Sequence, residues 1–171
     1  MPIRPVLDTL AATLQRVDAT HAALMNEGLD RDAIASRLAS VPVQFAAEVH
    51  DYFAWRNGLR ADRSVEFELF PEAVMLSLDE SIADYRMLCN IASTISKEAG
   101  IPAAAVWDEN WLPLFRHPAG GAYHVTVGAA AQAERAPILS ILQQDVSGAF
   151  VAFDSLEDLA RKANEWLLQK N

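Results

Sequence analysis

The sequence predicts an α+β fold, in which an antiparallel sheet of about four to six strands is flanked by helices. Apolar residues recur at every third or fourth position over residues 6–58 and again over 82–100, the spacing of amphipathic helices. They alternate with polar residues over 65–78 and in several segments of 111–153, the spacing of strands. Helices precede most strands, an order that argues against repeated strand–helix–strand units.

The first 42 residues predict two helices that precede the sheet. From Val6 onwards, apolar positions form one face of a helix that ends near Gly28. A short second helix runs through Leu38, with Asp30 suited to cap its first turn. Pro42 ends this region, because its ring disfavours helical geometry in the residue before it.

The next segment predicts a helix, two short strands and a long helix. VPVQFAAEVHDYFAWRNGL carries a helical stripe, and Asn57-Gly58 supplies the left-handed residue that commonly ends a helix. Alternation over 65–78 predicts two strands, separated by Pro71. Helical spacing then returns over 82–100, so we expect a long helix that packs on the sheet.

The second half predicts mostly sheet, followed by a capped helix. Four segments have strand character: Trp111–Phe115, Tyr123–Val127, Ile138–Leu142 and Phe150–Phe153. In the second of them the alternation places His124 and Thr126 on the solvent side. Ser155-Leu156-Glu157-Asp158 matches a capping box and opens a C-terminal helix through Leu168.

Length and composition restrict the class of protein. The 171 residues suit a single domain, 1–171, with a substantial core. No apolar run approaches the roughly 18 residues of a membrane span, and polar residues interrupt the N-terminus before a signal sequence can form. Cys89 is the single cysteine, which excludes an intramolecular disulfide and agrees with a reducing compartment. We therefore expect a cytoplasmic protein.

The negative charge is concentrated in the middle of the chain. The formal net charge is −9, and residues 60–110 carry 4 basic and 10 acidic side chains. A negative surface repels the phosphates of nucleic acids and acidic lipid headgroups, so neither is expected as a partner. A surplus of acids also keeps a protein in solution, and this reading remains an alternative to a role in binding a basic protein.

No motif of a known catalytic mechanism is present. The sequence contains no G-x-S-x-G, P-loop, H-E-x-x-H or G-x-G-x-x-G pattern. We predict no catalytic residue, metal site or cofactor. One alternative is a metal-dependent enzyme that uses His117 and His124, with Asp108 or Glu109 near the same end of a predicted hairpin. Cys89 lies in an apolar helical stripe and is expected to be an inert core thiol.

Three segments resemble landmarks of the SUKH superfamily, in the same order along the chain. VPVQFAAEVHDYFAWRNGL is similar to the opening helix of that family. WLPLFRHPAGGAYHVTV resembles its strand with Trp111 and Pro113, the glycine turn and the next strand. FVAFDSLEDLARKANEWL resembles its final strand and serine-capped helix. The resemblance covers roughly 40–168 and implies that 1–39 form an N-terminal helical extension packed on this core.

The resemblance also implies a protein that acts by binding rather than by catalysis. Bacterial members serve largely as immunity proteins that neutralise toxins of competing cells, and a yeast relative regulates cell-wall synthesis. We therefore expect a non-enzymatic immunity protein with a toxin as its protein partner. A basic toxin, such as a nuclease, would suit the acidity of residues 60–110.

The expected partner-binding surface combines acids with a tryptophan. Trp107 stands next to polar residues, and a partly exposed tryptophan beside acids is common at protein interfaces. The predicted binding residues are Asp79, Glu80, Asp84, Trp107, Asp108 and Glu109. A further alternative is a regulatory or scaffold protein whose N-terminal helix, 4–27, joins a partner or a second copy in a homodimer. The same apolar stripe also fits a helix that folds onto its own core.

Overall fold

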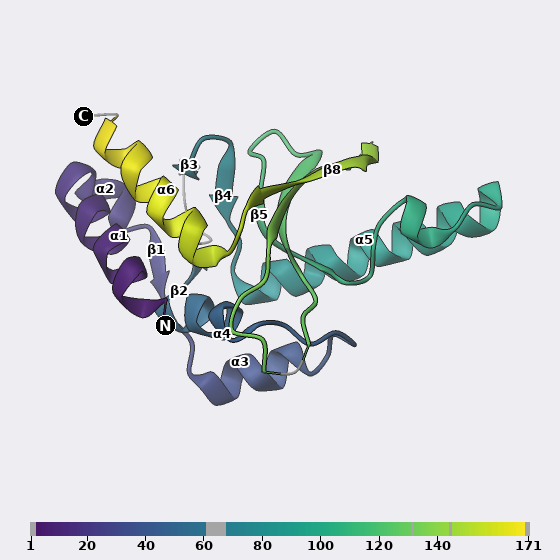
Figure 1. The fold of residues 1–171 in the computed structure, drawn as a ribbon, viewed down its shortest axis with the longest axis horizontal. Coiled ribbons are helices and arrows are strands. Elements are labelled where there is room, and N and C mark those ends of the chain that lie inside the picture. The colour runs from purple at the N-terminus through teal and green to yellow at the C-terminus, as the bar shows by residue number, and fades with distance from the viewer. Residues whose placement is uncertain (1–2, 61–67, 131, 144, 170–171) are drawn as a thin grey trace.

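The fold contains a six-stranded antiparallel sheet with helices on both faces (Figure 1). The computed structural model describes residues 3–60, 68–130, 132–143 and 145–169. The strand order is β3-β4-β5-β6-β7-β8, so each strand pairs with its neighbours in the chain. The strands are β3 (Glu68–Phe70), β4 (Ala73–Met75), β5 (Trp111–Arg116), β6 (Ala122–Val127), β7 (Ile138–Leu142) and β8 (Asp145–Phe153). The predicted α+β class is confirmed.

The helices flank this sheet, and two further strands form a small second sheet. The helices are α1 (Arg4–Val17), α2 (Ala19–Ala22), α3 (Arg31–Leu38), α4 (Ala47–Trp55), α5 (Leu78–Ala99), the 3-10 turn η1 (Ala103–Ala105) and α6 (Leu156–Gln169). β1 (Met25–Glu27) pairs antiparallel with β2 (Arg56–Leu59). Within the described ranges, no helix has both the length and the apolarity needed to cross a membrane.

The prediction of one N-terminal helix to Gly28 is wrong. α1 ends at Val17, and Asp18 has φ −154° and ψ 74°, outside helical geometry. The Asp18 side chain accepts a hydrogen bond from the backbone N–H of His21 and so starts α2. The chain then enters β1. Gly28 lies against the end of α4, where a Cβ atom would come within 1.9 Å of the Ala54 carbonyl oxygen.

The dipeptide Asn57-Gly58 does not end a helix as predicted, because α4 already ends at Trp55. Gly58 lies in β2 with φ +67°, a left-handed conformation that favours glycine. The Asn57 side chain accepts a hydrogen bond from the backbone N–H of Leu78 at 2.8 Å. The dipeptide therefore lies within β2, and the Asn57 side chain joins this strand to the start of α5 through a hydrogen bond.

Other predicted boundaries agree with the structure. The second helix is α3, although the Asp30 side chain makes no capping hydrogen bond. α5 ends at Gly100, which is left-handed with φ 67°. At the start of α6, Ser155 Oγ accepts a hydrogen bond from the N–H of Asp158 at 3.1 Å, as predicted for the cap. The first half of the strand predicted from residue 65 lies outside the described residues.

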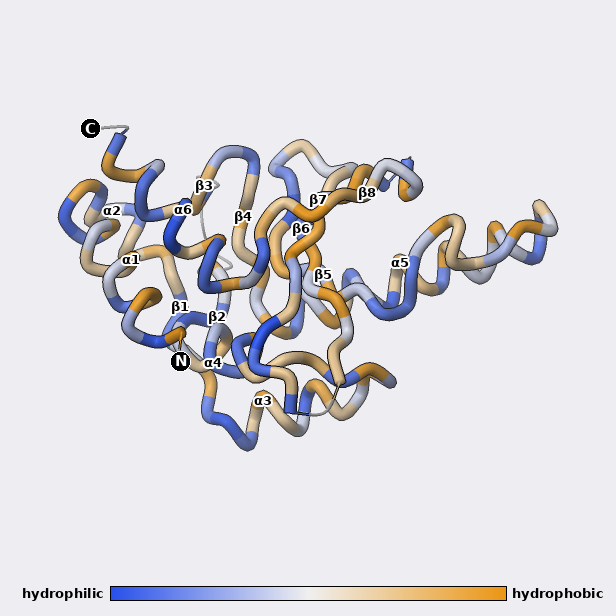
Figure 2. Tube along the Cα trace, viewed as in Figure 1, coloured by the Kyte–Doolittle hydropathy of each residue, from blue (hydrophilic) through white to orange (hydrophobic). Residues whose placement is uncertain are grey.

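The two faces of the sheet belong to two hydrophobic clusters. Phe115 and Ile138 pack in the larger cluster, together with buried side chains of α1, α3, α4 and α6. Residues 3–39 contribute to this cluster through fully buried side chains such as Leu10 and Ile34. Tyr123 and Val125 face the opposite way and pack in the smaller cluster with part of α5. Figure 2 shows the resulting concentration of apolar residues along β6, β7 and β8.

The prediction that His124 and Thr126 face solvent is wrong. Thr126 is fully buried. The His124 ring packs against Phe70 and Phe153, with ring centroids 5.2 Å and 6.0 Å away. His124 is half-buried, because aromatic side chains of neighbouring strands cover its side of β6.

Candidate protein-binding cleft

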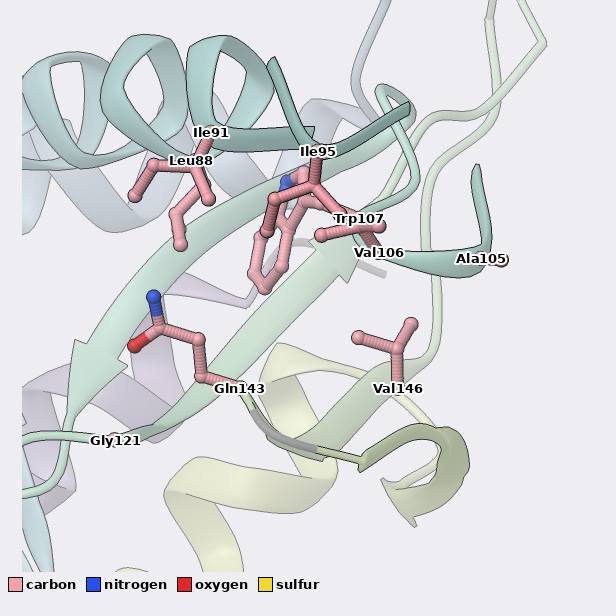
Figure 3. A pocket seen from close by; sticks show the side chains of 9 residues that line it. All are labelled: Leu88, Ile91, Ile95, Ala105, Val106, Trp107, Gly121, Gln143 and Val146. Atoms are coloured by element: carbon pink, nitrogen blue, oxygen red, sulfur yellow. The ribbon is translucent and has the colours of Figure 1, made fainter. Parts of the chain in front are cut away.

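An open cavity of about 520 Å³ lies between α5, the η1 turn and the strand ends of β6, β7 and β8 (Figure 3). Leu88, Ile91 and Ile95 of α5 form one wall. Gln143 and Val146, which lie on either side of the β7–β8 turn, form the opposite side. All residues that line the cavity are uncharged. We refer to this cavity and its lining residues as the cleft.

The wall of the cleft exists because α5 is longer than the sheet surface it covers. α5 has 22 residues, which corresponds to roughly 33 Å of helix. Its first half packs on the sheet, whereas its C-terminal half projects beyond the body of the molecule (Figure 1). Ile95 is consequently 37% exposed although it belongs to the apolar stripe of the helix. The projecting turns provide an apolar surface that the chain itself leaves partly uncovered.

Both ends of α5 are capped, which supports the projecting part. Ser77 Oγ accepts a hydrogen bond from the backbone N–H of Glu80 at 3.2 Å. The Glu80 carboxylate accepts one from the N–H of Ser77 at 2.8 Å, completing a capping box. At the other end, the left-handed Gly100 donates its N–H to the Ser96 carbonyl.

Trp107 closes the inner side of the cleft. It is only 3% exposed and makes edge-to-face contacts with Trp111 and Tyr123, at centroid distances of 5.5 Å and 5.9 Å. Its Nε1 has no hydrogen-bond partner within the described part of the chain. The expectation of a partly exposed indole is therefore corrected. The backbone turns back at η1, where the Trp107 N–H is donated to the Ala103 carbonyl, and directs the ring inwards.

Asp108 and Glu109 lie beside Trp107, at the start of β5. The Asp108 carboxylate accepts hydrogen bonds from the backbone N–H and the side-chain amide of Asn110, at 2.9 Å and 3.0 Å. The Glu109 side chain is exposed, and its carbonyl accepts a hydrogen bond from the Tyr85 hydroxyl at 3.0 Å. Burial raises the pKa of the Tyr85 hydroxyl to about 12, and the negative charges of Asp108 and Glu109 add to this effect. This contact fixes the acidic turn against α5.

The three predicted acids of α5 have different surroundings. Asp79 is exposed and pairs with Arg37 at 2.9 Å, and Glu80 belongs to the capping box. Asp84 is half-buried, and its Oδ2 atom has no hydrogen-bond partner among the described residues. Burial raises the pKa of the Asp84 carboxyl, while the positive charge of Arg116 opposes this effect. Asp84 is thus the one predicted acid whose carboxylate retains an unused acceptor inside the fold.

The structure brings only part of the predicted surface to the cleft. Trp107 lines it, and Asp84 lies one helical turn before Leu88. Sequence reasoning missed Ile91 and the hairpin residues Gln143 and Val146. The signal that could have found them is the length of the apolar stripe over 82–100. A helix of this length is longer than a sheet of short strands, so part of its apolar face is left to form a cleft wall.

The two histidines proposed as metal ligands do not share a site. Among the described residues, no three His, Cys, Asp or Glu side chains lie close enough to hold a metal ion. His117 Nδ1 accepts a hydrogen bond from the backbone N–H of Ala119 at 3.0 Å, and its Nε2 lies 3.8 Å from Glu72. Burial lowers the pKa of His124 to about 4, which keeps this ring neutral at physiological pH. Burial also raises the pKa of the Cys89 thiol, so the reactive thiolate is disfavoured.

The N-terminal helix is not free for a partner. α1 packs against α6, and the stripe that suggested a docking helix is buried in the larger cluster through Leu7, Leu10 and Leu14. This packing corresponds to a helix folded onto its own core. A homodimer or scaffold contact through residues 4–27 therefore gains no support from the observed packing.

Comparison with models of known protein families gives no match for this chain. No curated protein sequence matches it either.

Proposed function

We propose that this chain is a non-enzymatic protein-binding module, and more specifically an immunity protein that neutralises a toxin by binding to it. The observation that carries this proposal is the cleft, an open and uncharged cavity closed on its inner side by Trp107. The centres of protein interfaces are typically apolar and poor in charged residues, with a polar rim around them, and the lining of the cleft has that composition. The resemblance to the SUKH superfamily supports the same reading.

The chemistry of the cleft favours a protein side chain over a reacting substrate. A catalytic pocket needs converging acid, base or nucleophilic groups, whereas this lining offers aliphatic and aromatic surface with one amide, that of Gln143. An apolar side chain of a partner would remove the exposed parts of Ile91 and Ile95 from water, with the Trp107 ring as the inner wall of the cleft. That burial favours the complex, and the resulting affinity depends on how well the partner's side chain fits the cleft.

The acids around the cleft indicate the charge of the partner. Glu109 is exposed beside Trp107, and Asp79 is exposed at the start of α5. Residues 60–110 account for an excess of six negative charges out of nine. Such a field accelerates association with a basic protein and selects against acidic ones. A basic toxin is therefore the partner that fits best.

The test is a calorimetric titration of the purified chain with the product of the neighbouring toxin gene. We expect tight binding that weakens as the salt concentration rises, because charge complementarity is screened. The Ile91→Ala/Ile95→Ala double variant should weaken binding at least about tenfold. Leu168→Ala provides a matched control, since it truncates a 46% exposed residue on α6, which does not line the cleft.

Two results would contradict the proposal. One is a genome in which no toxin gene neighbours the gene for this chain, together with no binding to any candidate. The other is tight binding that the double variant leaves unchanged, which would assign the interaction to a different surface. A regulatory protein that uses the same cleft remains the second candidate, and binding to a non-toxic cellular protein with the same dependence on Ile91 and Ile95 would support it.

A further inference from the structure

The outer edge of the sheet carries the most exposed apolar side chains of the described residues. Phe150 and Val151 of β8 are 60% and 54% exposed, and Leu142 of the adjoining β7 is 59% exposed. The remaining exposed large apolar residues in the described ranges reach at most 46%. Three such residues therefore gather on one hairpin.

β8 is also an unprotected edge strand. It is the last strand of the order, and no other strand among the described residues pairs with its outer side. Proline and charged residues usually prevent an edge strand from pairing with another chain. Residues 146–153 contain neither. Among the described residues, the protection of this edge consists of two register shifts against β7. The opposite edge, β3, has three residues and packs against α6.

We propose that two copies of this chain associate through β8, in an antiparallel pairing around a two-fold axis near Val151. The two six-stranded sheets then form one continuous sheet across the dimer. Each β8 supplies the backbone donors and acceptors that the other lacks. In this register Val151 packs against Val151 of the other copy, and Phe150, on the opposite face of the sheet, packs beside Ala152 of the other copy.

The charges on β8 favour a second copy over a basic partner strand. The segment that pairs is uncharged, so it offers no acid to attract a basic strand. Asp145 and Asp154 flank it, but in a pairing centred on Val151 residue 154 lies opposite Gly148 of the other copy. The two acids therefore do not oppose each other across the interface. When β8 pairs with β8 of a second copy, any charge near the axis faces the same charge, so an uncharged segment favours this pairing.

The two proposed interactions respond to salt in opposite ways. Each copy carries a formal charge of −9, so long-range repulsion opposes the dimer and added salt strengthens it. Binding of a basic toxin to the cleft weakens with salt. The dimer is independent of the toxin proposal, and either can fail without the other.

The experiment is a measurement of mass in solution, by light scattering or sedimentation equilibrium, over a wide range of protein concentrations. We expect a concentration-dependent species of twice 18.7 kDa that is enriched at high salt. Val151→Lys places a charge at the axis and should raise the dissociation constant at least about tenfold. Met87→Lys is the matched control, because it adds the same charge at a 44% exposed residue of α5. Circular dichroism of both variants verifies that the fold is retained.

Three results would overturn the proposal. The wild-type chain could have the mass of one copy at every concentration, or the dimer could survive Val151→Lys. In the third case, the β8 amides exchange hydrogen at a rate independent of concentration and become protected only when the toxin is added. That result would assign the edge to the partner protein.

Discussion

The two faces of the sheet are covered in different ways. One face carries Phe115 and His124 and is enclosed by helices from both ends of the chain, α1 and α6 among them. The other carries Tyr123 and Val125 and is covered mainly by one helix, α5, and the turn that leads to Trp107. The first face is a continuous core, whereas the second ends in an open cleft. The main core and the proposed binding cleft therefore lie on opposite sides of the same strands.

The comparison predicts the largest loss of stability from a truncation on the enclosed face. Phe115 is fully buried and contacts Phe70 and Tyr52 at centroid distances of 5.2 Å and 5.9 Å. Phe115→Ala should reduce the free energy of unfolding by about 3–5 kcal/mol, measured by urea denaturation. Leu168→Ala, at an exposed site, should change it by less than about 0.5 kcal/mol. Similar losses for the two variants would mean that this face is not the main core.

Acid should weaken the enclosed face through His124. Burial lowers the pKa of its ring from 6.5 to about 4. Between these two pH values the ring is protonated in the unfolded chain but mostly neutral in the folded chain. The contribution of the neutral His124 ring to the free energy of unfolding is fully present above pH 6.5. It decreases by on the order of 2–3 kcal/mol as the pH falls from 6.5 towards 4. Urea denaturation at pH 7 and near pH 4.5 should show this loss.

The His124→Leu variant isolates this contribution. Its stability should fall less than that of the wild type over the same interval. The comparison is needed because burial raises the pKa of Glu48, whose ionisation destabilises the fold at higher pH and so acts in the opposite direction. Parallel pH profiles for the variant and the wild type would contradict the assignment to His124.

A smaller effect is expected where α5 begins. Ser77→Ala removes the acceptor for the Glu80 N–H and should cost about 1 kcal/mol of unfolding free energy. Ser93→Ala, in the interior of the same helix, should be neutral or slightly stabilising because alanine is the better helix former. Equal effects of the two substitutions would indicate that contacts with the sheet, and not the cap, determine where α5 starts.

The smallest change in stability is expected in the cleft. Ile95 is 37% exposed, so Ile95→Ala should lower the free energy of unfolding by less than about 1 kcal/mol. The same residue contributes to the proposed loss of toxin affinity. A stability loss comparable to that of Phe115→Ala would show that the cleft is part of the core and would remove the distinction between the two faces.

The sequence predicted elements wherever local signals determine them. The alternation in β6 reflects residues that face two different clusters, since Tyr123 and Val125 pack in the smaller one and His124 faces Phe115 of the larger one. The Gly100 end of α5 and the Ser155 cap of α6 depend on residues within a few positions of each other. These features need no information from distant parts of the chain.

The errors arose where distant segments decide the structure. The predicted helix to Gly28 is interrupted at Asp18, and its last part is replaced by the strand β1, which pairs with β2 about 30 positions further along. The polar character of His124 predicts an outward position, but Phe70, Phe115 and Phe153, which come from three other strands, surround its ring. Trp107 was placed near the surface because its neighbours are polar, yet only those neighbours point outwards. In each case the local pattern does not contain the distant residues that surround the segment in the folded chain.

The contact between α1 and α6 has a consequence for synthesis of the chain. These helices lie at opposite ends of the sequence, yet each covers apolar residues of the other. While the ribosome is still translating, Leu7 and Leu10 have no α6 to pack against and remain exposed to water. A contact between such distant segments forms slowly and late in folding. We therefore expect the nascent chain to need protection by chaperones until its last helix has emerged.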